Sequence, residues 1–282
     1  LDLYHRLVDD HPDHFRLVGN RTDLEAVLSA WEKPLPEVPS GETGQERPAM
    51  HGRPVGLVVL MEGADGVRSP AELDEWWEGG VRLIGLAWAG TRYSGGTREP
   101  GPLTAEGQAL LEAMADHGFA LDLSHMDSAA AFQALERYPG PILASHANPL
   151  AMLKGSDSNR HLPDAVVDGV LERDGVIGIV PYNRFLSVDW EEAHGKAAVS
   201  LRTVVTHIDY ICQRAGDARH VGIGSDFDGG FGKESVPAEI DSIADLQLIA
   251  PLLAEKGYND EDIAAIFGGN WLAFLRRILP GS

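Results

Sequence analysis

Two apolar runs, Phe119-Ala-Leu-Asp-Leu-Ser-His125 and Pro141-Ile-Leu-Ala-Ser-His146, lie on either side of a segment with helical periodicity at residues 128–137. Each run is short, rich in aliphatic side chains and bounded by Gly, Pro or polar residues, which is typical of a buried β-strand. A helix between two such strands supplies the crossover connection that parallel strands require. This stretch therefore predicts a strand, helix, strand unit with parallel pairing.

The same alternation extends along the chain in both directions. The predicted strands cover residues 55–60, 81–86, 119–123, 141–144, 176–180 and 221–223, and further helices are predicted at 104–117, 163–173, 199–214, 243–256 and 260–279. This order predicts an α/β fold in which helices cover a parallel sheet. The sheet could be open and doubly wound, or closed into a (β/α)8 barrel of the TIM type. No repeat divides the chain, so we expect one domain over residues 1–282.

The composition limits the partners of the chain. Its 282 residues include 43 acidic and 23 basic side chains, and the formal charge of −20 repels phosphate backbones and anionic lipids. We therefore expect neither nucleic acid nor membrane partners, and no apolar run approaches the ~18–20 residues that span a bilayer. The single cysteine, Cys212, cannot form an intramolecular disulfide, and we expect a cytoplasmic protein. The sequence does not determine the oligomeric state and is compatible with a homodimer.

A charged or imidazole side chain follows the end of four predicted strands: Glu62, His125, His146 and Asp226. In a barrel all carboxyl ends of the strands face the same mouth, so these side chains would meet there. Zinc takes neutral imidazole nitrogen and carboxylate oxygen as ligands, and two His with one carboxylate leave a position for water. A bridging carboxylate such as Glu62 could also hold two ions about 3.5–4 Å apart. The pattern favours the barrel and indicates a metal site.

Each of these residues also has a purely structural interpretation. A single His at a strand end is more often a hydrogen-bonded structural residue than a ligand, Glu62-Gly63 could begin an ordinary loop, and Asp226-Phe-Asp-Gly-Gly230 could be a tight turn. Arg160 could clamp a substrate carboxylate with its planar guanidinium, or pair with Asp164 at the start of the next helix. The chain has no phosphate-binding loop, no dinucleotide fingerprint and no Gly-x-Ser-x-Gly turn, so these nucleotide and serine hydrolase motifs are excluded.

Seven short motifs add a resemblance that covers the chain from Tyr4 to its end. They are Met61-Glu-Gly63, Asp122-Leu-Ser-His125, Ser145-His146, Arg160-His-Leu-Pro-Asp164, His207-Ile-Asp-Tyr210, Gly224-Ser-Asp-Phe-Asp-Gly229 and Gly269-Asn-Trp-Leu272. In this order they resemble the membrane (renal) dipeptidase family of zinc peptidases. That family belongs to the amidohydrolase-like (β/α)8 barrels, so the resemblance implies the same fold here.

The resemblance also implies a role for each candidate residue. Glu62 would bridge two zinc ions, and His125 and His146 would complete the second zinc site. Arg160 would bind the terminal carboxylate of a dipeptide, and Asp226 would handle the substrate amino group and transfer a proton. These roles suit a site in which metal-bound hydroxide attacks a peptide carbonyl.

Two features depart from the family's pattern. Its first zinc also uses a His-x-Asp pair on the opening barrel strand, and only six strands are predicted here, so we expect one or two strands to precede Leu1 and the domain to be incomplete at its N-terminus. We interpret His11-Pro-Asp13 as unrelated to that pair, because it lies in a polar segment between helical stretches. Trp88 stands where the dipeptidases usually have a His that polarises the scissile carbonyl, and an indole offers only one N–H donor. Arg92 or Tyr93 could supply a donor instead.

The prediction from the sequence is a zinc-dependent dipeptidase that cleaves a small dipeptide-like amide. Two zinc ions per chain are expected if the strand with His-x-Asp is present. Two alternatives stay open. One is a related metal-dependent hydrolase of another amide, a lactam or a lactone, which Trp88 favours, and the other is an inactive barrel that binds a ligand or a partner.

Overall fold

The computed structural model describes residues 1–33 and 53–281. Its α-helices are α1 (Asp2–Asp10), α2 (Arg21–Glu32), α3 (Leu73–Glu78), α4 (Ala105–His117), α5 (Ser128–Arg137), α6 (Asp164–Glu172), α7 (Asn183–Leu186), α8 (Leu201–Ala215), α9 (Ile249–Lys256), α10 (Asp260–Ala264) and α11 (Asn270–Ile278). Its strands are β1 (Phe15–Leu17), β2 (Val55–Leu57), β3 (Val59–Glu62), β4 (Val81–Gly85), β5 (Ser94–Gly96), β6 (Glu99–Leu103), β7 (Ala120–Asp122), β8 (Ile142–Leu143), β9 (Ile177–Ile179) and β10 (Val221–Ile223). None of the helices within these residues combines the length and the apolar character needed to cross a bilayer.

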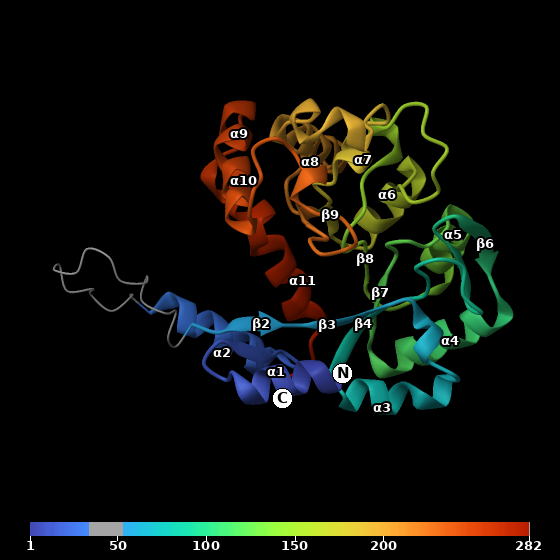
Figure 1. Cartoon of the computed structure of the whole chain (residues 1–282). Helices are drawn as coiled ribbons and strands as arrows, with labels where there is room; N and C mark the ends of the chain where they lie inside the picture. Colours follow the sequence, from blue (N-terminus) through green and yellow to red (C-terminus); the bar gives the residue numbers. More distant parts are fainter. Residues whose placement is uncertain (34–52, 282) are drawn as a thin grey trace.

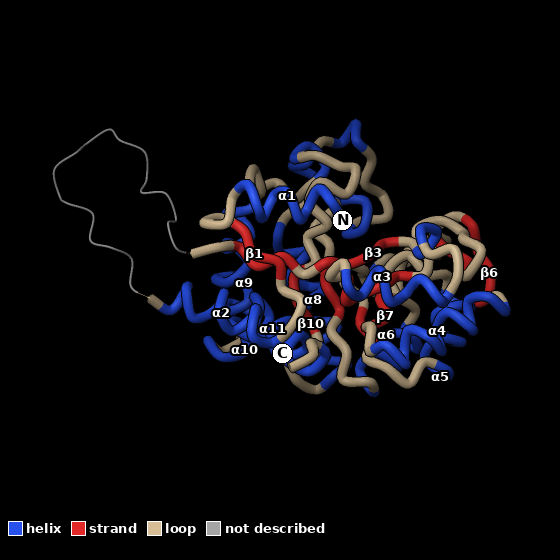
Figure 2. The backbone as a smooth tube through the Cα atoms, turned by 90° about the horizontal axis from the view of Figure 1, so that it is seen from below, coloured by secondary structure: helices blue, strands red, loops and turns tan. Residues whose placement is uncertain are grey.

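Parallel strands follow one another in chain order, with helices around them (Figures 1 and 2). β1 pairs with β2, and the series β3, β4, β7 and β8 forms a four-stranded parallel sheet. A parallel bridge between Ala144 and Ile177 leads on to β9, which pairs with β10. Only Val58 separates β2 from β3, so these two strands form one path. The α/β prediction is confirmed; in the described part of the chain β10 forms no ladder with β1, and the strands make an open arc.

The predicted strands are all present, with small shifts at their ends. Residues 221–223 match β10, whereas 81–86, 119–123, 141–144 and 176–180 each lose one or two residues, and 55–60 divides into β2 and β3. The sequence does not predict β1, which is only partly buried. It also does not predict the antiparallel hairpin of β5 and β6, because β6 contains Pro100 and Pro102 and lacks an apolar run.

Helix α4 shows why the predicted helices form where they do. Thr104 precedes it, and the Oγ1 atom of this residue accepts a hydrogen bond from the backbone N of Gly107 at 3.0 Å. Gly118 ends the helix with a left-handed φ of 86°. Three aliphatic or thioether side chains on one stripe are buried, each worth about 1.5–3 kcal/mol against exposure; they are Leu110, Leu111 and Met114. The helix predicted at 260–279 is instead broken, because Gly268 has an extended backbone between α10 and α11.

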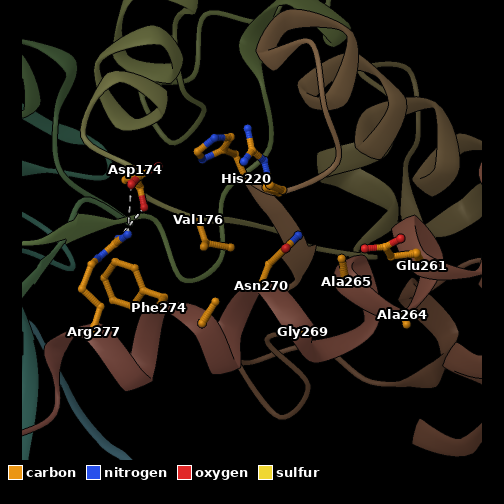
Figure 3. A pocket seen from close by; sticks show the side chains of 12 residues that line it. Asp174, Val176, His220, Glu261, Ala264, Ala265, Gly269, Asn270, Phe274 and Arg277 are labelled. Atoms are coloured by element: carbon orange, nitrogen blue, oxygen red, sulfur yellow. Dashed lines mark hydrogen bonds and ion pairs between the residues drawn. The ribbon is translucent and has the colours of Figure 1, made fainter.

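Helix α11 packs against one face of the strands. Its side chains Trp271, Phe274 and Ile278 pack with Leu83, Ala120, Leu143 and Val176 in one apolar layer. Beside this layer a cavity of about 460 Å³ opens near the starts of β9 and β10, and Figure 3 shows Asp174 and Arg277 paired at its edge. The predicted metal ligands contribute nothing to its lining, since they follow the opposite ends of the strands.

Candidate metal centre

Three strands of one parallel sheet, β3, β7 and β8, bring the predicted ligands to one edge of the sheet. Glu62 is the last residue of β3, His125 lies three residues beyond β7, and His146 lies three residues beyond β8. The chain turns sharply at two of these ends, because φ is 81° at Gly63 and 68° at His125. A left-handed backbone suits Gly, but at a His it costs on the order of 1–3 kcal/mol, and such strain clusters at functional sites.

The three side chains meet at a single point. The Oε1 atom of Glu62 lies 3.1 Å from Nε2 of His125 and 2.9 Å from Nε2 of His146, and the two Nε2 atoms are 3.0 Å apart. Both imidazoles are buried, while the Glu62 side chain is 39% exposed. Two imidazole nitrogens and a carboxylate oxygen this close together are a donor set that fits a divalent ion such as zinc.

Ser145 and Asp122 fix the orientation of the His146 ring. The Ser145 hydroxyl donates a hydrogen bond to Oδ2 of Asp122 at 2.5 Å, and the same Oγ lies 2.7 Å from Nδ1 of His146. A hydroxyl has one proton, so with that proton on Asp122 the Oγ accepts the Nδ1–H of His146. Nδ1 therefore keeps its proton, and Nε2, which faces Glu62, is the nitrogen left for a metal.

Thr97 has the corresponding position behind His125. Its Oγ1 lies 3.0 Å from Nδ1 of His125 and 3.4 Å from the carbonyl oxygen of the same residue. The hydroxyl can donate to the carbonyl and accept from Nδ1–H, which again leaves Nε2 for a metal. The indole of Trp88 stacks on the His125 ring, with the ring centroids 5.5 Å apart and the planes at 26°.

The ionisation of Glu62 and His125 suits metal binding. Hydrogen bonds with His125 and His146 hold the pKa of Glu62 well below its usual range, so the carboxyl is ionised at neutral pH. Burial lowers the pKa of His125, and this effect exceeds the opposing effect of the hydrogen bond to Glu62. A proton on the Nε2 of His125 is therefore easily displaced, as metal binding requires.

Arg160 is a buried cation behind His146. The residue is 3% exposed, and its Nη2 donates a hydrogen bond to the carbonyl oxygen of His146 at 2.7 Å. Its Nε and Nη1 have no hydrogen-bond partner in the part of the chain that the structure describes. Burial lowers the pKa of Arg160 to about 10, which leaves it charged at neutral pH. Unpartnered N–H groups on a buried cation are suited to an anion such as a carboxylate.

The structure does not contain the alternative ion pair between Arg160 and Asp164. The Asp164 carboxylate instead lies 3.1 Å from Nη1 of Arg214 and accepts a hydrogen bond from the Tyr210 hydroxyl at 2.6 Å. The arginine is therefore held through the backbone of His146 and not through the helix that follows it.

Asp226 lies three residues beyond β10 and outside the group of three ligands. Its φ of 51° is left-handed and its carbonyl accepts a hydrogen bond from the Gly229 backbone N at 2.8 Å, so the segment does form a tight turn. Burial raises the pKa of the Asp226 carboxyl, with His146 and Arg160 opposing this and Glu62 adding to it. The charges of the site thus influence the pKa of Asp226, and the carboxyl retains a proton more readily than that of an exposed Asp.

Other positions singled out from the sequence lie elsewhere or are already engaged. His11 and Asp13 precede β1, and the parallel register of β1 with β2 places them at the end of the strands opposite Glu62. The segment lies between α1 and α2 as predicted, with β1 directly after it. Tyr93 is buried with its hydroxyl donating to the carbonyl oxygen of Val67, so it is not a free donor for a substrate, and the Arg92 guanidinium lies over the Tyr93 ring.

Three residues that orient the ligands received no role from the sequence. Asp122 and Ser145 stand within the motifs, and a carboxylate ending a wholly apolar strand was a usable signal for a buried hydrogen-bond acceptor. Thr97 had no such signal, since it lies 28 residues from His125 in a hairpin rich in Gly and Pro.

Comparison with known proteins agrees with this geometry. Residues 45–279 match the membrane dipeptidase family, peptidase family M19. A Klebsiella pneumoniae protein described as an uncharacterized protein in the pqqA 5′ region is 30% identical over 232 residues, which cover 79% of this chain and 82% of that protein. An uncharacterized dipeptidase of Schizosaccharomyces pombe is 31% identical over 225 residues, 76% of this chain, and here the chain spans only 52% of the relative's length.

Solved structures share the fold. A metallopeptidase from Rhodobacter sphaeroides, determined with a phosphinate mimic of the dipeptide L-Ala-D-Ala, superposes with a TM-score of 0.74 at 23% identity over 94% of this chain and 69% of that one. This likeness, with the parallel strand order, confirms the prediction of a TIM-type barrel fold, of which the strands of the described residues form an open arc.

Proposed function

The chain belongs to the membrane dipeptidase family, peptidase family M19, and on that premise we propose that it is a zinc-dependent dipeptidase. The proposed substrate is a small dipeptide with a free carboxylate. It is supported by the fission yeast relative described as a dipeptidase and by the dipeptide mimic bound to the Rhodobacter metallopeptidase. The proposed roles are metal ligands for Glu62, His125 and His146, carboxylate binding for Arg160, and proton transfer for Asp226.

One observation carries the proposal: a single oxygen of Glu62 lies within 3.1 Å of the Nε2 atoms of two buried histidines. Both rings hold their other nitrogen against a hydroxyl, from Thr97 for His125 and from Ser145 for His146. Three donors converging with their outer hydrogen bonds in place are the arrangement of a metal site and are not needed for packing.

The remaining residues fit the hydrolysis of an amide. Zinc, when bound, would lower the pKa of a coordinated water and polarise the substrate carbonyl. Arg160 would hold the terminal carboxylate through N–H groups that have no partner in the structure, which fixes the scissile bond beside His146. Asp226 has a raised pKa and is suited to accept a proton during attack and to return it to the leaving amine.

The experiment measures metal content and hydrolysis on the same preparation. The purified chain is loaded with zinc, bound metal is measured by mass spectrometry, and release of free amino acid is followed for dipeptides with L- or D-residues at the carboxyl end. His125→Ala should lose a metal ion and most of the activity. His117→Ala is the matched control, because this His lies at the end of α4 and bonds to Ala113 and Asp74.

The outcomes distinguish the dipeptidase from a related hydrolase and from a binding protein. Bound zinc with release of free amino acid supports the dipeptidase. Bound zinc with hydrolysis of a lactam or lactone but of no dipeptide would replace it with the related hydrolase. A chain that binds no zinc, or a His125→Ala variant with full activity, would contradict the metal assignment and favour a binding protein.

A further inference from the structure

Trp88 holds an unusual position next to the candidate metal centre. Its side chain is large and apolar yet the residue is 51% exposed, and one face of the indole stacks on the ring of His125. Among the large apolar residues exposed in residues 1–33 and 53–281, it is the one stacked on a member of the ligand cluster. A single exposed apolar side chain is common on a protein surface, so what distinguishes Trp88 is its stack on a ring of the ligand cluster.

The backbone fixes the indole in place. The Thr97 backbone N donates a hydrogen bond to the Trp88 carbonyl at 2.9 Å, and the hydroxyl of the same Thr97 lies against Nδ1 of His125. One residue therefore sets both the ring and the indole stacked on it. Gly63 lies next to Trp88, because a Cβ on Gly63 would be in ordinary van der Waals contact with the Trp88 backbone N at 3.5 Å.

The groups around the site occur in a continuous series of contacts. Arg160 bonds to the carbonyl of His146, the Nε2 of His146 lies 3.0 Å from that of His125, and the His125 ring stacks on Trp88. A dipeptide whose carboxylate binds Arg160 must extend its other residue away from this anchor. The apolar face of Trp88 stands at the opposite end of the series.

We propose that Trp88 is a specificity-determining residue, an apolar platform that binds the side chain of the amino-terminal residue of the dipeptide. This inference rests on the dipeptidase function proposed above and adds a preference to it, for large apolar side chains over glycine. An indole has no acceptor and a single donor, so the selection comes from apolar contact area and not from hydrogen bonding.

The test compares two substrates in three variants. kcat/KM is measured for leucyl-alanine and glycyl-alanine with the zinc-loaded wild type, Trp88→Ala, Trp88→Phe and the control Trp31→Phe. Trp31 is an exposed indole of α2 that donates to the Pro54 carbonyl. Trp88→Ala should reduce the preference for leucyl-alanine by about ten-fold, which is the size expected for one side chain in an apolar pocket. Trp88→Phe should keep most of the preference, and Trp31→Phe all of it.

A second readout does not depend on turnover. Leucyl-alanine should change the tryptophan fluorescence of the wild type and of Trp31→Phe at lower concentration than glycyl-alanine, and Trp88→Phe should lose that change. Equal loss of kcat/KM for both substrates in Trp88→Ala, or equal affinities for both dipeptides in the fluorescence titration, would overturn the inference. If no dipeptide is hydrolysed by the wild type, the proposed function fails, and the titration alone then decides the role of Trp88.

Discussion

Asp122 accepts two hydrogen bonds from Ser145, one from its backbone N at 2.9 Å and one from its hydroxyl at 2.5 Å. Asp122 ends β7 and Ser145 follows β8, so this pair ties together the strand ends that carry His125 and His146. The carboxylate is 1% exposed and also accepts a hydrogen bond from the Ser124 backbone N at 3.0 Å. A buried carboxylate with three donors is therefore part of the support for the ligands.

The first prediction concerns the change of Asp122 to Asn. An amide nitrogen next to Ser145 would donate to the hydroxyl, which would then direct its own proton to Nδ1 of His146. His146 would be driven to carry its proton on Nε2, the atom that faces Glu62. We expect Asp122→Asn to lower zinc affinity by about 10–100-fold, measured by competition with a chromogenic chelator.

The control for this change is Asp168→Asn. Asp168 lies on α6, where its carboxylate pairs with Arg214 at 2.5 Å on the surface. This variant has the same chemical change far from the strand ends and should bind zinc as the wild type does. Wild-type zinc affinity in a folded Asp122→Asn protein would contradict the role given to the carboxylate.

Thr97→Val tests the corresponding support of His125. Val has the shape of Thr but cannot accept the Nδ1–H of His125, so both ring nitrogens become equally available for the proton. We expect zinc affinity to fall by about ten-fold or more, while Thr97→Ser, which keeps the hydroxyl, should stay within a few-fold of the wild type. The comparison uses the same chelator competition, and equal affinities of the Val and Ser variants would count against the prediction.

The sequence predicts the fold well where each element has a local signal. The apolar runs before Glu62 and Asp226 fix both the strands and the ends at which the polar residues stand, and helix α5 matches its predicted residues 128–137. β1 and the β5–β6 hairpin are not predicted from the sequence, because their pairing depends on neighbours in space and their own composition is polar or rich in Gly and Pro.

In the site, too, residues with a local sequence signal are predicted and residues placed by neighbours in space are not. The three ligands each follow an apolar run, so parallel pairing alone predicts that they meet. The stack of Trp88 on His125 and the hydroxyl of Thr97 come from the segment between β4 and β6, whose path is not encoded by periodicity. The sequence marks Trp88 only as a departure from a resemblance, and its stack on His125 depends on the path of the chain in space.

Arg160→Ala tests the carboxylate site. The N–H groups of Arg160 without partners should bind a free carboxylate, so the variant should raise KM for dipeptides by about ten-fold or more and change kcat less. A dipeptide with an amidated carboxyl end is the matched substrate, because it lacks the anion that Arg160 would hold. An equal loss for the amidated and free dipeptides would show that Arg160 acts in some other way.

The last prediction concerns stability in acid. Burial lowers the pKa of His161 to about 3, with Arg160 and then His207 adding to this, and burial lowers the pKa of His207 to about 4 against a hydrogen bond with the Leu186 backbone. In the unfolded chain both should have a pKa of about 6.5. Below that pH the unfolded chain binds protons that the folded protein excludes, so the free energy of unfolding falls as the pH falls from about 6.5 towards 4, and is constant above about 7.

Urea unfolding at pH 5 should give a free energy lower than at pH 7 by on the order of 1–2 kcal/mol for each of these histidines. His207→Leu should reduce that difference, whereas His5→Leu, at an exposed position, should leave it intact, and an unchanged difference in His207→Leu would show that this buried imidazole does not drive the acid sensitivity.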